Sequence, residues 1–402
     1  MAPSRLFVLY LLGFLLAATL SAAEPETLSW QSPATGGSVA LTVLNPTGEQ
    51  SGDRPLVVYL QNLAAPRVGT ESDASIVRGF RTAGDLVVLA DYAHHPRARV
   101  PHLNADLAKL REDLLHGRLL KGHAFDPARV HIVPSGCRLL RDVEFYPAPG
   151  RPLAMDIVYP SRPAQQVGAL LEFSCDNQDR MGNGSLAICS DTILDGMATE
   201  GFAVAMADHP VPPPYKGLDP MPACAWKIKA AVRTLRAQRE ALPLSGKIGV
   251  VGFSRGSGMA LMLAATGGQP EFEGHGNHQQ ASSAVQAAVV MSGRFTYLDL
   301  LEDDHMLPRY AQAWGEREAN LEVWRHHGAL DYLTSSTLPL FLTINAAEGP
   351  DALHQMTVLR KRLAELGNDE VFLMDRTPRG HKVTLDPEIL AAMRDYLRRR
   401  LQ

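Results

Sequence analysis

The sequence predicts an α/β protein: a mostly parallel sheet flanked by helices, preceded by a smaller α/β N-terminal region. Apolar strands alternate with helical stretches at the spacing of βαβ units. In the run "KIGVVGFSRGSGMALMLAATGG" (247–268), a buried strand turns directly into a helix of strong helix formers. The chain has 402 residues, 46% hydrophobic and 20% charged, so we expect a large core and no global disorder.

The first residues have the pattern of a secretory signal peptide. Arg5 is the only charge before an apolar run over 6–20, and small residues at 21–23 offer a cleavage site. The run is short for a membrane span. We therefore expect a signal peptide over 1–23 and a secreted or periplasmic mature chain with no stable membrane anchor, an uncleaved anchor being the alternative. The net charge is −4 and no basic run indicates a nucleic-acid partner.

Two parts of the chain repeat one order of elements: strand, loop, strand, Pro-rich loop, helix, strand. Between them, "RDVEFYPAPGRPLAMDIVYPSRPA" alternates apolar residues around a turn, which predicts an antiparallel hairpin. We place a domain boundary near Leu140, with an N-terminal region of unassigned role over 24–140 and a second domain over 141–402. Ser135 of the first part lacks a glycine two residues before it, so we do not interpret it as a nucleophile.

The strand-to-helix turn at 252–256 has the spacing G-x-S-x-G. Glycines two residues before and two after Ser254 remove the Cβ clashes of a tight strand–helix turn. Such a turn lifts the serine hydroxyl out of the fold and leaves the next backbone N–H, that of Arg255, at a helix N-terminus. Because a hydroxyl alone is a weak nucleophile, this interpretation requires a histidine and an acid elsewhere in the chain.

Candidates for both partners follow later strands, and sites in parallel sheets form at the carboxyl ends of strands. His381 stands in a loop after the last strand, "VFLMDRT". The acid after the strand "FLTIN" is Glu348 or Asp351. Glu348 is closer to the strand end and is preferred, whereas Asp351 follows Pro350 at a helix start, where an acid often serves as a cap. The order Ser, acid, His is that of the α/β-hydrolase triad.

From about Arg141 to its end, the sequence resembles the α/β-hydrolase superfamily, in particular the bacterial feruloyl/acetyl esterase-like (BD-FAE-like) branch of secreted carboxylesterases. The segments that carry the resemblance are "GRPLAMDIVYPSRP", "KAAVRTLRA", "KIGVVGFSRGSG", "SSAVQAAVV" and "RGH". The resemblance implies a serine esterase with Ser254 as nucleophile, His381 as base and a carboxylate after "FLTIN". It implies no cofactor, and as substrates carboxylic esters such as acetyl or feruloyl groups on small molecules or polysaccharides.

The chain departs from the usual pattern at one oxyanion-hole loop. The His-Gly-Gly-Gly that often follows the first long parallel strand is absent, and "FSCDNQDRMGN" (173–183) stands there. We expect the oxyanion-hole donors to be the backbone N–H of Arg255 and that of Cys175 or Asp176. The Arg255 side chain could contact a substrate carboxylate or phenolate, or pair with a nearby acid.

Two further patterns leave alternatives open. The cysteines are Cys137, Cys175, Cys189 and Cys224, and an exported chain could join Cys175 to Cys189 or keep buried thiols. The loop "EFEGHGNHQ" offers Glu271, Glu273, His275 and His278 as conceivable metal ligands, although a polar loop is the preferred interpretation and no metal is expected.

Two other functions compete with the esterase. A peptidase of the prolyl-oligopeptidase type would use the same fold, but no propeller repeats precede the second domain. A binding protein without catalysis would explain the missing His-Gly-Gly-Gly. The presence of a serine, an acid and a histidine in the α/β-hydrolase order along the chain argues against it.

Overall fold

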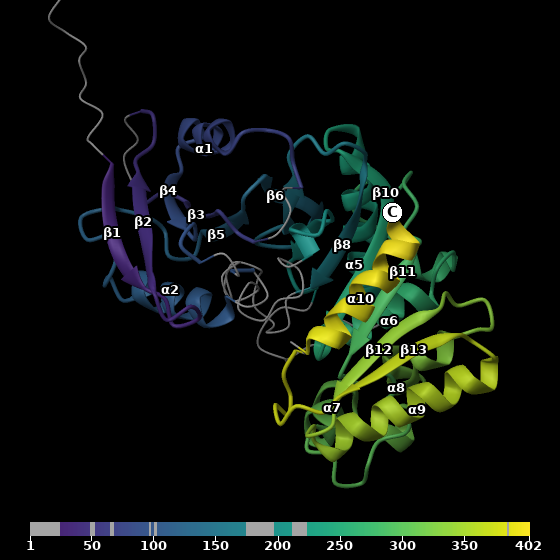
Figure 1. Cartoon of the computed structure of the whole chain (residues 1–402). Helices are drawn as coiled ribbons and strands as arrows, with labels where there is room; N and C mark the ends of the chain where they lie inside the picture. The colour runs from purple at the N-terminus through teal and green to yellow at the C-terminus, as the bar shows by residue number, and fades with distance from the viewer. Residues whose placement is uncertain are drawn as a thin grey trace, which may run out of the picture.

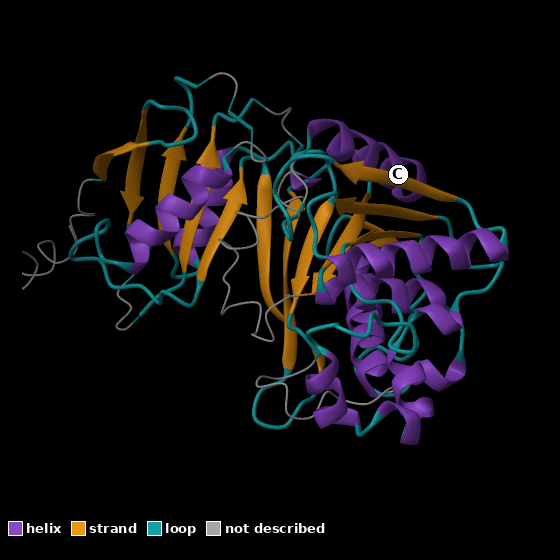
Figure 2. Cartoon of the chain, turned by 90° about the horizontal axis from the view of Figure 1, so that it is seen from below, coloured by secondary structure: helices purple, strands orange, loops and turns teal. Residues whose placement is uncertain are grey.

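A computed structural model describes residues 25–48, 53–64, 68–95, 98–99, 103–173, 197–210, 223–383 and 386–402. They form a five-stranded sheet, ordered β1-β2-β4-β3-β5, and an eight-stranded sheet, ordered β13-β12-β11-β10-β8-β9-β7-β6. The two sheets lie side by side (Figures 1 and 2). The predicted fold class is confirmed, since a mostly parallel sheet flanked by helices follows a smaller α/β region.

The first sheet is built around a parallel βαβαβ unit. Its elements are β1 (Glu26–Gln31), β2 (Ser38–Leu44), β3 (Leu56–Gln61), α1 (Asp73–Thr82), β4 (Leu86–Asp91), α2 (Asn104–Leu115) and β5 (Val130–Pro134). β3 pairs in parallel with both β4 and β5, and the β1–β2 hairpin joins the sheet antiparallel to β4.

The expectation of a plain loop between β3 and β4 is wrong, because α1 lies there. The Ser72 side chain caps this helix by accepting a hydrogen bond from the backbone N–H of Ser75. Ile76, Val77 and Phe80 form its buried stripe. The helix is only ten residues long, so its stripe offers a weak periodic signal in sequence.

The second sheet opens with the predicted antiparallel hairpin and continues as parallel strands. Its strands are β6 (Cys137–Tyr146), β7 (Leu153–Pro160), β8 (Val167–Phe173), β9 (Ala203–Ala207), β10 (Leu244–Phe253), β11 (Ala287–Met291), β12 (Leu340–Asn345) and β13 (Glu370–Asp375). β8, β10, β11, β12 and β13 are parallel neighbours in that order. The boundary expected near Leu140 lies within β6, the first strand of this sheet.

Helices cover both faces of the second sheet. They are α5 (Ala223–Ala237), α6 (Arg255–Ala265), α9 (Pro350–Leu366) and α10 (Pro387–Leu401). Two further helices, α7 (Leu307–Trp314) and α8 (Leu321–His327), form an apolar cluster of their own. Apolar residues of α5, α6 and α9 share one core cluster. Those of α10 share another with α1 and β3 of the first sheet, so the two sheets have one continuous core on that side. Among the described residues, no helix has the length and hydropathy of a membrane span. The predicted signal peptide lies outside them.

Candidate active site

The turn between β10 and α6 has the geometry of a nucleophile elbow. Ser254 occupies it with φ 53° and ψ −118°, a strained conformation for a residue with a side chain. A Cβ on Gly252 would lie 2.2 Å from the backbone oxygen of Gly256, so the close approach of strand and helix requires glycine there. The local sequence therefore sets the position of the serine hydroxyl at the turn.

Ser254, His381 and Glu348 form a continuous chain of contacts. Ser254 Oγ lies 2.9 Å from His381 Nε2, and His381 Nδ1 lies 2.9 Å from Glu348 Oε2. Because a carboxylate only accepts hydrogen bonds, Nδ1 carries the proton shared with Glu348, and Nε2 accepts from the serine hydroxyl. The Glu348 side chain is 2% exposed, whereas that of His381 is 52% exposed. The three groups come from the ends of β10, β12 and β13, which the parallel sheet brings together.

Asp351, the alternative acid, contacts other groups. Its Oδ2 lies 2.9 Å from His305 Nδ1 and 3.5 Å from Arg294 Nη2. It belongs to the first turn of α9, whereas Glu348 precedes that helix. Of the two carboxylates left open by the sequence, Glu348 is the one in contact with the imidazole of His381.

The expected oxyanion-hole donors lie partly outside the described residues. α6 begins at Arg255, whose backbone N–H is therefore one of the first-turn donors that a helix leaves for other partners. Cys175 and Asp176, expected to supply the second donor, lie outside the described residues, as does Cys189.

A cavity of about 560 Å³ opens beside the serine. Its aromatic wall consists of Tyr297, Tyr310, Trp314 and His327, and its arginines are Arg255, Arg294 and Arg309. Burial lowers the pKa of His327, so this ring is neutral near pH 7. Cys224 also lines the cavity, and burial raises the pKa of its thiol to about 12, so it stays protonated and unreactive. Cys137 is likewise a buried thiol.

The aromatic wall comes from the segment between β11 and β12, for which the sequence predicted no functional residue. Tyr310 and Trp314 stack with ring centroids 5.0 Å apart, and Trp314 stacks on His327 at 4.0 Å. Trp324 meets Trp314 edge to face and donates from Nε1 to the backbone oxygen of Gly315. The spacing of Tyr310 and Trp314, one helical turn apart, was the available signal for a shared face.

Arg294 stands at the polar side of this cavity. Burial alone would lower its pKa, but Tyr310 and a hydrogen bond to Asp304 outweigh burial and raise the pKa. Asp304, His305 and Asp351 bring their ligand atoms within 4.8 Å of one another, as a metal site would. Arg294 forms ion pairs with both carboxylates, which supplies the positive charge that a cation would otherwise bring.

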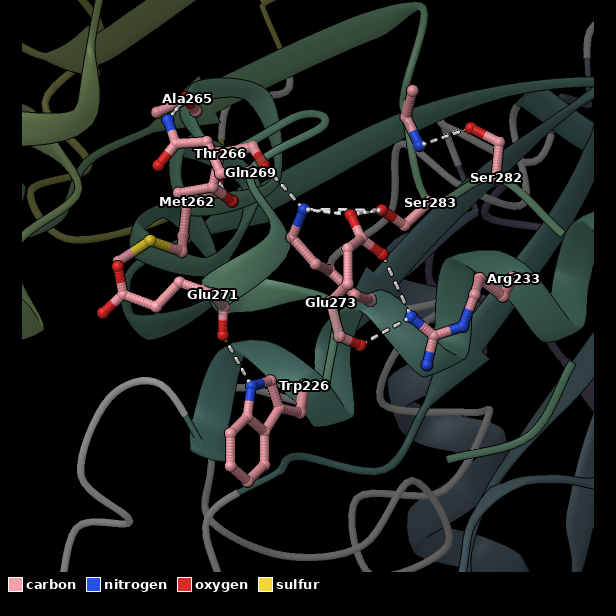
Figure 3. A network of polar contacts seen from close by, with 12 residues as sticks. Trp226, Arg233, Met262, Ala265, Thr266, Gln269, Glu271, Glu273, Ser282 and Ser283 are labelled. Carbon is pink, nitrogen blue, oxygen red and sulfur yellow. Dashed lines mark hydrogen bonds and ion pairs between the residues drawn. The ribbon is translucent and has the colours of Figure 1, made fainter. Parts of the chain in front are cut away.

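The loop over 271–279, which offers conceivable metal ligands in sequence, contains a network of ion pairs (Figure 3). Glu273 accepts from Lys229 Nζ at 2.9 Å and from Arg233 Nη1 at 3.2 Å. The Lys229 side chain is fully buried, so its ammonium requires this carboxylate. His275 packs edge to face against Trp226, whose Nε1 donates to the backbone oxygen of Glu271. These contacts agree with the preferred interpretation of a polar loop.

Known proteins resemble the chain in fold and in part of its sequence. Residues 182–360 match the model of the BD-FAE family. A solved structure of a truncated carbohydrate esterase from gut microbiota superposes with a TM-score of 0.56 and 18% identity, over 65% of this chain and 95% of that chain. Among curated proteins, none is significantly similar to this sequence.

Two further solved structures share the fold. A bifunctional GH43-CE protein of Bacteroides eggerthii matches with a TM-score of 0.56 and 20% identity, over 65% of this chain and 38% of that chain. An acetyl ester-xyloside bifunctional hydrolase from Caldicellulosiruptor lactoaceticus matches with a TM-score of 0.51 and 16% identity, over 66% of this chain and 97% of that chain. At these identities the likeness establishes the fold. Together with the family match, it confirms the predicted resemblance: this chain has an α/β-hydrolase fold similar to that of the BD-FAE esterases.

Proposed function

We propose that this chain is a secreted serine esterase that hydrolyses carboxylic esters through Ser254, His381 and Glu348. The contact chain from Glu348 through His381 to Ser254, at the edge of the cavity, is the observation that carries the proposal. The strained elbow supports it independently, because such strain persists at sites where the position of one side chain matters.

The reaction begins when Ser254 Oγ attacks the ester carbonyl carbon. His381 Nε2 takes the hydroxyl proton, and the buried Glu348 carboxylate stabilises the imidazolium through Nδ1. The carbonyl oxygen becomes an oxyanion, for which the backbone N–H of Arg255 and one from the Cys175/Asp176 loop are the expected donors. The alcohol leaves with the proton from Nε2, and an acyl group remains on Ser254.

Water completes the cycle. It gives a proton to His381 Nε2 as it attacks the acyl carbon, the second tetrahedral intermediate collapses, and the proton returns to Ser254 Oγ as the carboxylic acid departs. This scheme uses no cofactor.

For the substrate, we favour acetyl or feruloyl esters of polysaccharides. The BD-FAE match and the neighbours described as a carbohydrate esterase and an acetyl ester-xyloside hydrolase support this class. The aromatic wall offers Tyr310 and Trp314 as surfaces for a sugar or aromatic ring. The signal-peptide pattern over 1–23 supports a substrate outside the cytoplasm.

The test is hydrolysis of p-nitrophenyl acetate and butyrate by the purified mature chain. Ser254→Ala should reduce turnover by at least about 10³-fold, because it removes the nucleophile. Ser283→Ala is the matched control, since Ser283 is a buried serine hydrogen-bonded to Glu273 in the network of Figure 3. Equal turnover by Ser254→Ala and wild type would contradict the proposal. No turnover and no fluorophosphonate labelling of wild type would favour the binding protein, and p-nitroanilide cleavage without ester cleavage would favour the peptidase.

A further inference from the structure

Ser292 directly follows β11 at the same sheet edge as Ser254. The ends of their strands pair in register, Phe253 with Met291, and the backbone N–H of Ser254 donates to the Met291 oxygen at 3.1 Å. Ser292 lines the cavity, yet the residue is only 2% exposed. A hydroxyl at this position is therefore beside the reacting groups and shielded from most solvent.

The Ser292 hydroxyl contacts His381. Its Oγ lies 3.3 Å from Nδ1, the nitrogen that also contacts Glu348 at 2.9 Å. His381 lies in the loop after β13 with its side chain about half exposed, so its ring orientation depends on a small set of contacts. These include Glu348, Ser292 and the ring of Phe253, whose centroid lies 4.8 Å away.

The backbone of Ser292 adopts a strained conformation. Its φ is 40°, in a region that disfavours residues with a Cβ by roughly 1–2 kcal/mol. Its N–H donates to the Thr343 oxygen at 3.3 Å, and its own oxygen accepts from Ser257 Oγ at 3.3 Å. Strain held in this way at a functional site points to a role for the side chain.

We infer that Ser292 is a positioning residue whose hydroxyl orients the His381 imidazole, an inference that rests on the proposed esterase activity. When Nε2 accepts the proton of Ser254, the Nδ1–H of the imidazolium becomes a stronger donor. Ser292 Oγ then offers a second acceptor beside Glu348. Because the hydroxyl acts through His381, its loss lowers kcat and leaves KM nearly unchanged.

Two substitutions separate the hydroxyl from the backbone strain. Ser292→Ala removes the hydroxyl and keeps the strain, whereas Ser292→Gly removes both. With p-nitrophenyl acetate and the mature chain, each should lower kcat at least about tenfold, the effect of one hydrogen bond to a charged group, with KM within about twofold of wild type. Ser283→Ala, in the network of Figure 3, should keep the wild-type kcat.

The outcomes distinguish this inference from the proposed function. If wild type is active and Ser292→Gly matches its kcat, the hydroxyl has no positioning role. A rise in KM that accounts for the whole loss would overturn the inference as well, because it would indicate a substrate contact. If wild type itself neither hydrolyses esters nor reacts with a fluorophosphonate, the proposed esterase fails and this inference fails with it.

Discussion

At the scale of single residues, the two acids near the site contact different groups. Glu348 is buried and contacts His381 through both carboxylate oxygens, whereas Asp351 contacts His305 and Arg294. The sequence could limit the acid to this pair because both follow the end of β12. It could not choose between them, because the choice depends on the path of the turn before α9.

This difference predicts unequal effects of removing the two charges. Glu348→Gln leaves a side chain of similar size but cannot stabilise the imidazolium, so kcat should fall about 10³- to 10⁴-fold. Asp351→Asn should lower kcat by less than about tenfold, since it weakens only the contacts with His305 and Arg294. Steady-state kinetics on p-nitrophenyl acetate checks both variants, and a larger loss for Asp351→Asn would assign the triad acid to Asp351.

At the scale of elements, the elbow was predictable and the cavity wall was not. The spacing of Gly252, Ser254 and Gly256 is a local signal, because it reports on one tight turn. The aromatic wall depends on how Tyr297 packs against Tyr310 and Trp314 of α7, and on how His327 of α8 packs against Trp314. Contacts between separate segments have no fixed spacing in sequence. The helix α1 was missed for another reason, because its ten residues give only a weak periodic signal.

The elbow predicts a strong effect of one added methyl group. In Gly252→Ala the new Cβ would lie 2.2 Å from the Gly256 oxygen, so strand and helix must separate. We expect a loss of about 1–3 kcal/mol in the free energy of unfolding. Esterase activity should fall as well, because Ser254 moves. Gly267→Ala is the control, since no atom lies within 4 Å of its added Cβ. Equal urea denaturation curves for the two variants would contradict this account.

At the scale of the whole molecule, a buried carboxylate links the two sheets. Glu71, just before α1, accepts from Arg138 Nε of β6 at 2.8 Å and also from Ser161 after β7. The hydrogen bonds from Arg138 hold the pKa of Glu71 well below its usual value. The sequence predicted both α/β regions, but pairs between residues so far apart in the chain leave no local pattern.

The lowered pKa of Glu71 predicts a pH-dependent stability. Its contribution is present above the unfolded-state pKa of about 4.3 and is lost as pH falls toward the folded-state value. At pH 7, Glu71→Gln should lower the free energy of unfolding by about 2 kcal/mol. The difference from wild type should shrink below pH 4. Urea denaturation of wild type and Glu71→Gln at pH 7 and below pH 4 measures this difference.

The exposed pair of Glu112 and Arg118 provides the control for that experiment. Glu112→Gln should leave the urea midpoint unchanged, because solvent screens an exposed pair. If Glu71→Gln has the same urea midpoint as wild type at pH 7, the hydrogen bonds from Arg138 and Ser161 to Glu71 do not stabilise the joined sheets.

The central claim is that Ser254, activated by His381, is the nucleophile. The most direct measurement is mass spectrometry of the mature chain after reaction with a fluorophosphonate. We predict a single adduct on the peptide that contains Ser254, absent in Ser254→Ala and formed much more slowly in Glu348→Gln. An unmodified chain, or an adduct on another residue with Ser254 unmodified, would contradict the account.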